Sequence, residues 1–127
     1  MRLLSFVLPM LALSFSAIPA MAAEKKVVYF PTWSADLDGD AQGVIDDAAT
    51  MAKDHARGTV LVSGFASTTG GHRANQLLAE LRAQVVADHL MEKGVKASRL
   101  RLVSRGDTHF VSTSLESRRV EVTVSDR

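Results

Sequence analysis

Cysteine is absent from this 127-residue sequence. We therefore expect neither a disulfide framework nor a lipid-modified cysteine. Beyond residue 22, no stretch approaches the roughly 20 apolar residues that a membrane crossing requires. The sequence also lacks a G-x-S-x-G nucleophile motif and a glycine-rich phosphate loop, so we expect no enzymatic activity. Neither sign of charge dominates, with 15 Lys and Arg against 14 Asp and Glu, which gives no indication of nucleic-acid binding.

The first 22 residues have the features of a secretory signal peptide. Arg2 supplies the positive charge, Leu3 to Ile18 the apolar run, and Ala20-Met21-Ala22 a small-x-small cleavage site. We expect this signal to be removed, leaving residues 23–127 as one domain in the periplasm, without a transmembrane segment or a lipid anchor. Charge is uneven along that domain, because residues 24–55 hold seven acidic and three basic side chains, whereas residues 56–127 hold seven acidic and eleven basic ones.

Hydrophobic periodicity predicts four strands and two helices. The expected strands are Val27–Phe30, Thr59–Phe65, Leu100–Val103 and Val120–Val124. The expected helices are Asp40–His55, capped by Asp38 or Asp40, and Arg73–Lys93, ended by Gly94. The apolar stripe of the second helix is expected to comprise Ala74, Leu77, Leu78, Leu81 and Val85. The order β-α-β-α-β-β predicts an α+β fold, a two-layer sandwich in which both helices cover one face of a mixed four-stranded sheet.

The segment Gly64–Val86, GFASTTGGHRANQLLAELRAQVV, is the most informative motif of the sequence. It agrees with the pattern G-x-T-D-x-x-G-x-x-x-x-N-x-x-L-S-x-x-R-A-x-x-V, without a gap, at Gly64, Gly70, Asn75, Leu78, Arg82, Ala83 and Val86. Near the C-terminus, Ser117–Val122 is similar to N-R-R-V-E-I. Both motifs resemble those of the OmpA-like C-terminal domain, the cell-wall-binding module shared by outer-membrane protein A, the peptidoglycan-associated lipoprotein and the flagellar stator protein. The resemblance implies that fold, with peptidoglycan as the partner and no cofactor.

The resemblance also implies a ligand site for diaminopimelate of the peptidoglycan stem peptide. In the family, a loop aspartate binds the ammonium group of this ligand and a helix arginine binds its carboxylate. Arg82 stands at the arginine position, whereas Ser67 replaces the aspartate. Because a hydroxyl offers no charge, we expect the affinity to fall by roughly one to two orders of magnitude. The implied ligand-binding residues are Arg82, Ser67, Asn75 and Arg119, with Arg118 as the alternative to Arg119.

On a helical wheel, Asn75, Arg82 and His89 are expected to border the buried face of the second helix without entering it. Arg82 then has a second interpretation, in which its stem packs along the sheet edge and its head pairs with a nearby carboxylate. Three carboxylates, Asp36, Asp38 and Asp107, are candidates to replace the missing aspartate. Which of them reaches the site is left open.

Two other patterns carry less weight. Asp36-Leu37-Asp38-Gly39-Asp40 resembles a calcium loop but lacks its glycine at the sixth position, so helix capping is the preferred interpretation. The four histidines show no metal-ligand spacing, and we expect no metal site. The alternative function is a protein-interaction module of the cell envelope that kept the fold and lost peptidoglycan binding. The acidic stretch from Asp36 to Asp47 is the candidate contact surface for that function.

Overall fold

Four strands form one mixed sheet in the computed structural model, which describes residues 23–66, 71–106 and 117–126. The strands are β1 (Glu24–Tyr29), β2 (Val60–Phe65), β3 (Leu100–Gly106) and β4 (Arg119–Val124), in the spatial order β1-β4-β2-β3. β2 and β3 run parallel, while β4 pairs antiparallel with both β1 and β2. The expected signal peptide lies outside the described residues.

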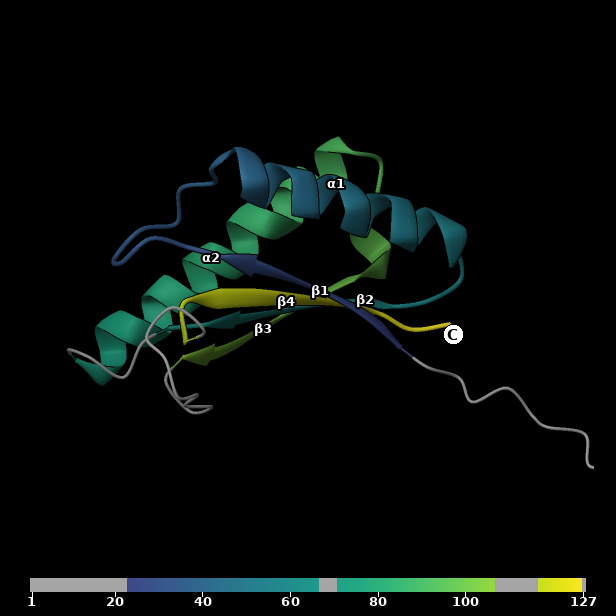
Figure 1. Cartoon of the computed structure of the whole chain (residues 1–127). Coiled ribbons are helices and arrows are strands. Elements are labelled where there is room, and N and C mark those ends of the chain that lie inside the picture. Colours follow the sequence, from purple (N-terminus) through teal and green to yellow (C-terminus); the bar gives the residue numbers. More distant parts are fainter. Residues whose placement is uncertain (1–22, 67–70, 107–116, 127) are drawn as a thin grey trace, which may run out of the picture.

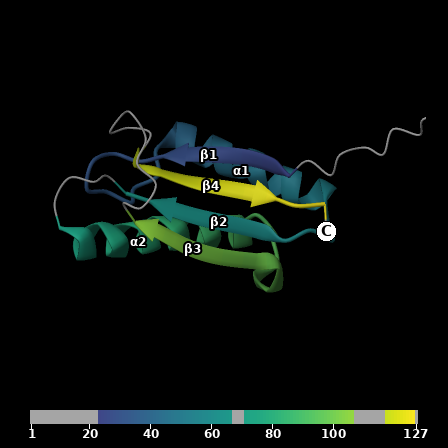
Figure 2. The ribbon, with the colours of Figure 1, turned by 90° about the horizontal axis from the view of Figure 1, so that it is seen from below.

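Both helices lie on the same face of this sheet (Figures 1 and 2). Helix α1 (Gly39–Asp54) packs over β1, and helix α2 (His72–Glu92) packs over β2 and β3. Among the described residues, no helix lies on the opposite face of the sheet, as the view from below shows (Figure 2). The predicted α+β fold, with a mixed four-stranded sheet and both helices on one side, is therefore confirmed.

Strand β1 begins three residues earlier than the apolar pattern predicts. Its first residue, Glu24, pairs with Val124, so that β1 follows β4 over the whole length of β4. Residues 24–26 are polar, and the sequence pattern therefore missed them. Glu24 and Lys25 are exposed, and charged side chains on an edge strand also hinder its pairing with another chain.

The buried face of α2 differs from the predicted one. Of the five predicted residues, Ala74 is exposed, and so are Leu77 and Leu81, at 47% and 52%, whereas Leu78 and Val85 are half-buried. The buried residues are instead Asn75, Ala79, Arg82, Ala83, Val86, Ala87 and Leu90. The prediction chose the face with the largest apolar side chains, whereas the structure buries a face rich in alanine.

A close approach between α2 and β2 explains this choice of face. A Cβ atom added to Gly64 would lie 2.0 Å from the carbonyl oxygen of Ala79 and 3.2 Å from the Cβ of Ala83. Only glycine in the strand and small residues in the helix allow the two backbones to come this near. The face with Leu77 and Leu81 is too bulky for such a contact.

Specific residues mark the ends of the helices. Asp38 is the N-cap of α1, and its Oδ1 accepts a hydrogen bond of 2.7 Å from the N–H of Ala41, which confirms one of the two predicted caps. At the end of α2, Gly94 has φ +100°, and its N–H donates to Met91 while that of Val95 donates to Leu90. This pair of bonds is the Schellman motif that follows many helices. Gly94 therefore ends α2 as predicted.

Arg99 caps the C-terminus of α1 from the 3-10 turn η1 (Ala97–Arg99). It donates from Nη1 to the carbonyl oxygen of Ala52 at 2.7 Å, from Nη2 to that of His55 at 2.7 Å, and from Nε to that of Gly58 at 2.9 Å. A cation in this place satisfies carbonyl groups that have no partner within the helix and interacts favourably with the helix dipole.

Candidate functional site

Arg82 is completely enclosed, with 0% of its surface exposed. Its guanidinium donates to three main-chain carbonyl oxygens, from Nε to Ser34 at 2.8 Å, from Nη2 to Pro31 at 3.0 Å and from Nη1 to Phe65 at 3.3 Å. The guanidinium carbon also lies 5.3 Å from the ring centre of Phe30, within the range of a cation–π contact. The expectation that Arg82 only borders the buried face is therefore wrong. The side chain enters the core because carbonyl dipoles and an aromatic ring replace its hydration.

The three carbonyl groups come from two different segments of the chain. Pro31 and Ser34 belong to the connection between β1 and α1, and Phe65 is the last residue of β2. Arg82 therefore ties α2 to both segments. One of its bonds is thus to Phe65, which comes two positions before Ser67 in the sequence. Ser67 itself lies outside the described residues.

Burial and a second arginine change the proton affinity of this group. Removal from water disfavours the charged form and, together with the positive charge of Arg118, lowers the pKa of Arg82 from its ordinary value to about 10. Burial is the larger cause. Since this value is still well above neutral pH, Arg82 carries its charge under ordinary conditions.

Arg118, rather than Arg119, is the C-terminal arginine near Arg82. Its Nε donates to the carbonyl oxygen of Phe30 at 3.1 Å, and its charge acts on the Arg82 guanidinium. Two guanidinium groups therefore lie near the point where β1 ends. Together they form a centre of positive charge on the helix-covered side of the sheet.

Arg119 lies on the opposite side of the sheet. Val120, Val122 and Val124 are buried beneath the helices, so the alternation of β4 sends Arg119 to the other face, where its side chain is only 11% exposed. There its guanidinium carbon lies 3.8 Å from the ring centre of Phe65, and its Nε donates to Glu121 at 3.1 Å. The sheet therefore separates Arg119 from Arg82.

The other members of the predicted row on α2 take different positions. Asn75 is buried, with 1% of its surface exposed, and it therefore also enters the core rather than bordering it. His89 is half-buried, and its Nδ1 lies 3.7 Å from a carboxylate oxygen of Glu92. The structure thus brings Asn75 and Arg82 to one buried face and leaves His89 at its edge.

No carboxylate is among the partners of Arg82 in the part of the chain that the structure describes. Asp38 is used as the α1 cap. The side chain of Asp36 is exposed, and its N–H donates to Ser34 Oγ at 3.0 Å. Asp107 lies outside the described residues. Among these residues, Arg82 therefore does not pair with a carboxylate, which was its second interpretation. Its guanidinium donates to carbonyl oxygens instead.

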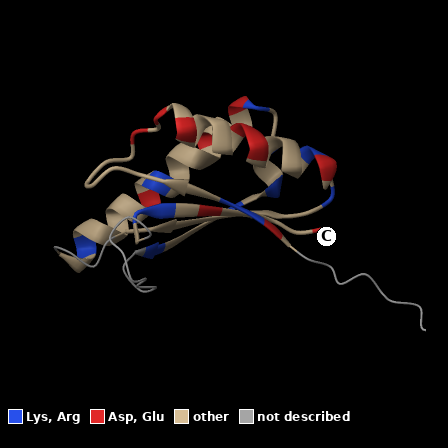
Figure 3. Cartoon of the chain, in the orientation of Figure 1, with Lys and Arg blue, Asp and Glu red and all other residues tan. Residues whose placement is uncertain are grey.

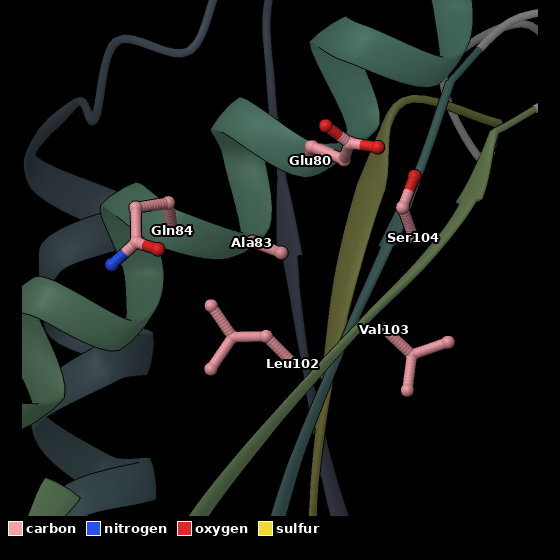
Figure 4. A pocket seen from close by; sticks show the side chains of 6 residues that line it. All are labelled: Glu80, Ala83, Gln84, Leu102, Val103 and Ser104. Atoms are coloured by element: carbon pink, nitrogen blue, oxygen red, sulfur yellow. The ribbon is translucent and has the colours of Figure 1, made fainter.

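A cavity of about 240 Å³ lies elsewhere, between the outer flank of α2 and β3 (Figure 4). Three residues from each element line it, namely Glu80, Ala83, Gln84, Leu102, Val103 and Ser104. The Ser104 hydroxyl donates to the carbonyl oxygen of Gln76 at 3.1 Å. None of the predicted site residues lines this cavity, so it is not the site that the motifs indicate.

The charged side chains are distributed as the sequence predicts. Acidic residues gather on α1 and on the segment that leads into it (Figure 3). Within residues 23–66, 71–106 and 117–126, no group of three or more His, Asp or Glu side chains is arranged to hold a metal ion. No helix in the same ranges is long and apolar enough to cross a membrane.

Sequence reasoning left two features of the site undetermined. One is the turn at Pro31–Ser34, whose carbonyl groups bind Arg82, and no sequence pattern identifies such acceptors because every residue has a carbonyl group. The other is the choice of Arg118 over Arg119. Here a signal was present, since the buried alternation from Val120 onward places Arg118 on the buried side and Arg119 on the open side.

Comparison with known proteins agrees with the motifs. Residues 29–121 match the OmpA family. The chain is 33% identical over 104 residues to the probable lipoprotein YiaD of Escherichia coli, covering 77% of this chain and 48% of that protein. It is 32% identical over 79 residues to the peptidoglycan-associated lipoprotein of Mesorhizobium japonicum, covering 62% of this chain and 47% of that protein.

A solved structure extends the comparison to the fold. The OmpA-like domain of FopA1 from Francisella tularensis superposes with a TM-score of 0.74 at 27% identity, covering 80% of this chain and 71% of that one. The chain spans about half the length, or less, of the curated relatives it matches. Since the family match covers most of the sequence, this chain belongs to the OmpA family.

Proposed function

We propose that this protein is a non-enzymatic component of the cell envelope that binds peptidoglycan in the periplasm. The observation that carries the proposal is the position of the Arg82 guanidinium, which is bonded to the carbonyl of Phe65 at the end of β2, two residues before Ser67. This is the place where the family motif puts its ligand site. The match to a peptidoglycan-associated lipoprotein supports the same partner.

The ligand is a stem peptide that carries diaminopimelate, whose free end offers a carboxylate beside an ammonium group. A guanidinium has five N–H groups, and three of those on Arg82 donate to the carbonyl oxygens named above. Because the side chain has no exposed surface, a carboxylate binds only where it displaces a carbonyl oxygen or other atoms that enclose the guanidinium. The nearby charge of Arg118 adds to the attraction for an anion.

Affinity for this ligand is weaker than the family motif alone implies, for two reasons. Ser67 supplies no charge for the ammonium group, which removes much of the roughly 1.5–3 kcal/mol of a charge-assisted hydrogen bond. In addition, Arg82 is fully enclosed, so a ligand gains only the difference between its own bonds and the carbonyl bonds that it displaces.

The second candidate function is a protein-interaction module. The burial of Arg82 favours it, because its three carbonyl bonds give this arginine a structural role that needs no ligand. The acidic surface of α1 would then be the contact surface (Figure 3).

Co-sedimentation with purified peptidoglycan sacculi tests the leading proposal. We expect weak binding by the wild type and stronger binding by Ser67→Asp, which restores the missing carboxylate. Ser98→Asp adds the same charge at an exposed position of η1 and should leave binding unchanged. If neither the wild type nor Ser67→Asp binds, the proposal is wrong.

Neutralising the acidic surface separates the two functions. Asp36 and Asp47 are exposed and hold no helix cap. The double substitution Asp36→Asn, Asp47→Asn should leave sacculus binding unchanged. Loss of a partner captured from an envelope extract, in a protein that does not bind sacculi, would favour the interaction module instead.

A further inference from the structure

Trp33 lies in a turn where tryptophan is unfavourable for two reasons, its exposure to solvent and its backbone conformation. Its side chain is 54% exposed, and its φ of 51° lies in the left-handed region. The turn is closed by a hydrogen bond of 3.3 Å from the N–H of Ser34 to the carbonyl oxygen of Pro31, which puts Trp33 at the third position. With a positive φ, that position favours glycine or asparagine. Folding therefore gives no reason for a large aromatic residue here.

The turn is held firmly even though the indole faces water. Arg82 binds the carbonyl oxygens of the two residues that flank this turn, Pro31 at 3.0 Å and Ser34 at 2.8 Å. The Ser34 hydroxyl also accepts a hydrogen bond from the N–H of Asp36 at 3.0 Å. An aromatic ring on a fixed turn loses little conformational entropy when it binds a ligand. Trp33 is thus prepared for contact directly beside the Arg82 site.

The surroundings of the indole match a sugar ring better than a protein or a membrane. A pyranose packs its polarised C–H groups on the electron-rich face of an indole, while its rim needs polar partners. Thr32 and Asp36 are exposed on the same segment. Within residues 31–40, Trp33 is the sole exposed large apolar side chain. A protein interface gathers several such side chains, and exposed aspartates disfavour an anionic membrane surface.

We propose that Trp33 is a stacking platform for a sugar ring of the peptidoglycan glycan strand. The inference rests on the proposed function and extends it, since the stem peptide would bind at Arg82 while the adjacent sugar stacks on Trp33. The contact is with the ring face, so it needs no charge on the ligand. It therefore partly compensates for the charge that Ser67 does not supply.

A peptide-free glycan isolates this contact. Trp33 is the one tryptophan of the sequence, so intrinsic fluorescence reports its environment directly. Titration of the wild type with a tetramer of N-acetylglucosamine should shift the indole emission saturably. An unchanged emission spectrum at all tetramer concentrations would overturn the inference.

Sacculus binding by Trp33→Gly separates a ligand role from a structural one. Glycine suits the positive φ, so this variant should be at least as stable as the wild type, yet we expect its sacculus affinity to fall roughly three- to tenfold, as for the loss of one aromatic stacking contact. Leu81→Ala removes another exposed apolar side chain, from α2, and should bind as the wild type does. Equal binding by Trp33→Gly and the wild type would overturn the inference while leaving the proposed function intact.

The remaining outcomes are also decisive. A saturable tetramer response in a protein that binds neither sacculi nor stem peptide would contradict the proposed function and, with it, the assignment of the stacked sugar to peptidoglycan. If the wild type captures an envelope protein, Trp33→Gly does not, and the tetramer gives no response, then Trp33 contacts a protein and not a sugar.

Discussion

The Nε–H of Arg82 donates to the main-chain carbonyl oxygen of Ser34 at 2.8 Å, across 48 residues of sequence. The residue that the family motif assigns to the ligand therefore also fixes the connection between β1 and α1. Under the proposed function, binding and stability are therefore coupled at this side chain. Loss of ligand binding in an Arg82→Ala variant would not by itself distinguish a ligand contact from a damaged fold.

Removal of the Arg82 guanidinium should be strongly destabilising. Arg82→Met keeps an apolar stem but removes the guanidinium donor from three carbonyl groups, of which that of Pro31 keeps a second hydrogen bond, from the N–H of Ser34. We expect a cost of about 3 kcal/mol in the free energy of unfolding. Urea unfolding at neutral pH measures this value. Arg101→Met at an exposed position of β3 is the matched control and should change stability by less than about 0.5 kcal/mol. A cost below about 1 kcal/mol for Arg82→Met would contradict the structural role.

Arg118→Gln should raise the pKa of Arg82. Burial and the charge of Arg118 lower this pKa to about 10, so removal of the second charge leaves burial alone. The Cζ chemical shift of Arg82, followed by NMR in alkaline solution, measures the midpoint. An unchanged midpoint in Arg118→Gln would show that the two guanidinium groups do not interact.

The direction of the pKa shift of Arg82 determines how its contribution to stability changes with pH. Because the folded pKa, about 10, lies below that of an exposed arginine in the unfolded chain, the unfolded state binds more protons only between these two pKa values. The contribution of Arg82 to stability therefore rises with pH in that window. Below it, Arg82 is charged in both states, so sacculus binding between pH 6 and 8 should not depend on its titration.

Two glycine substitutions should have opposite effects. Gly64→Ala puts a Cβ atom 2.0 Å from the carbonyl oxygen of Ala79, which forces α2 away from β2 and should cost about 3 kcal/mol or more. Gly43→Ala lies within α1 with nothing within 4 Å of the added atom, and it should stabilise the protein by up to about 1 kcal/mol. Thermal unfolding compares the two. Similar melting temperatures for both variants would contradict the close packing of α2.

Loss of the Arg99 cap should weaken the end of α1. Arg99→Met leaves the carbonyl groups of Ala52, His55 and Gly58 without this donor, and we expect a loss of about 2 kcal/mol. Arg57→Met, at an exposed position near the same helix end, is the control. Hydrogen exchange of the last turn of α1 should quicken in Arg99→Met alone. Equal exchange in both variants would show that the cap has no energetic role.

The fold could be predicted from the sequence because its signals are local. The alternation of Val120, Val122 and Val124 identifies β4, Asp38 caps the N-terminus of α1, and Gly94 supplies a left-handed residue after α2. Each signal depends on residues a few positions apart. The order of the elements then limits the fold to a small number of arrangements.

The candidate site could be predicted only in part, because its partners are distant in sequence. The motif located Arg82 correctly on α2, yet the carbonyl groups that enclose it come from the segment around Ser34 and from Phe65. Likewise, the alanine face of α2 is buried because Gly64 allows close contact, which helical periodicity alone does not reveal. The exposed leucines at 77 and 81 misled the prediction for this reason.

Calorimetric titration with a soluble stem peptide that carries diaminopimelate tests the central claim most directly. We predict that Ser67→Asp binds this peptide about 10- to 100-fold more tightly than the wild type. The added carboxylate binds the ammonium group of diaminopimelate, while Arg82 binds its carboxylate. The free energy of unfolding, measured in parallel, should differ little between the two proteins. Equal affinities, or no binding by either protein, would contradict the assignment of this site.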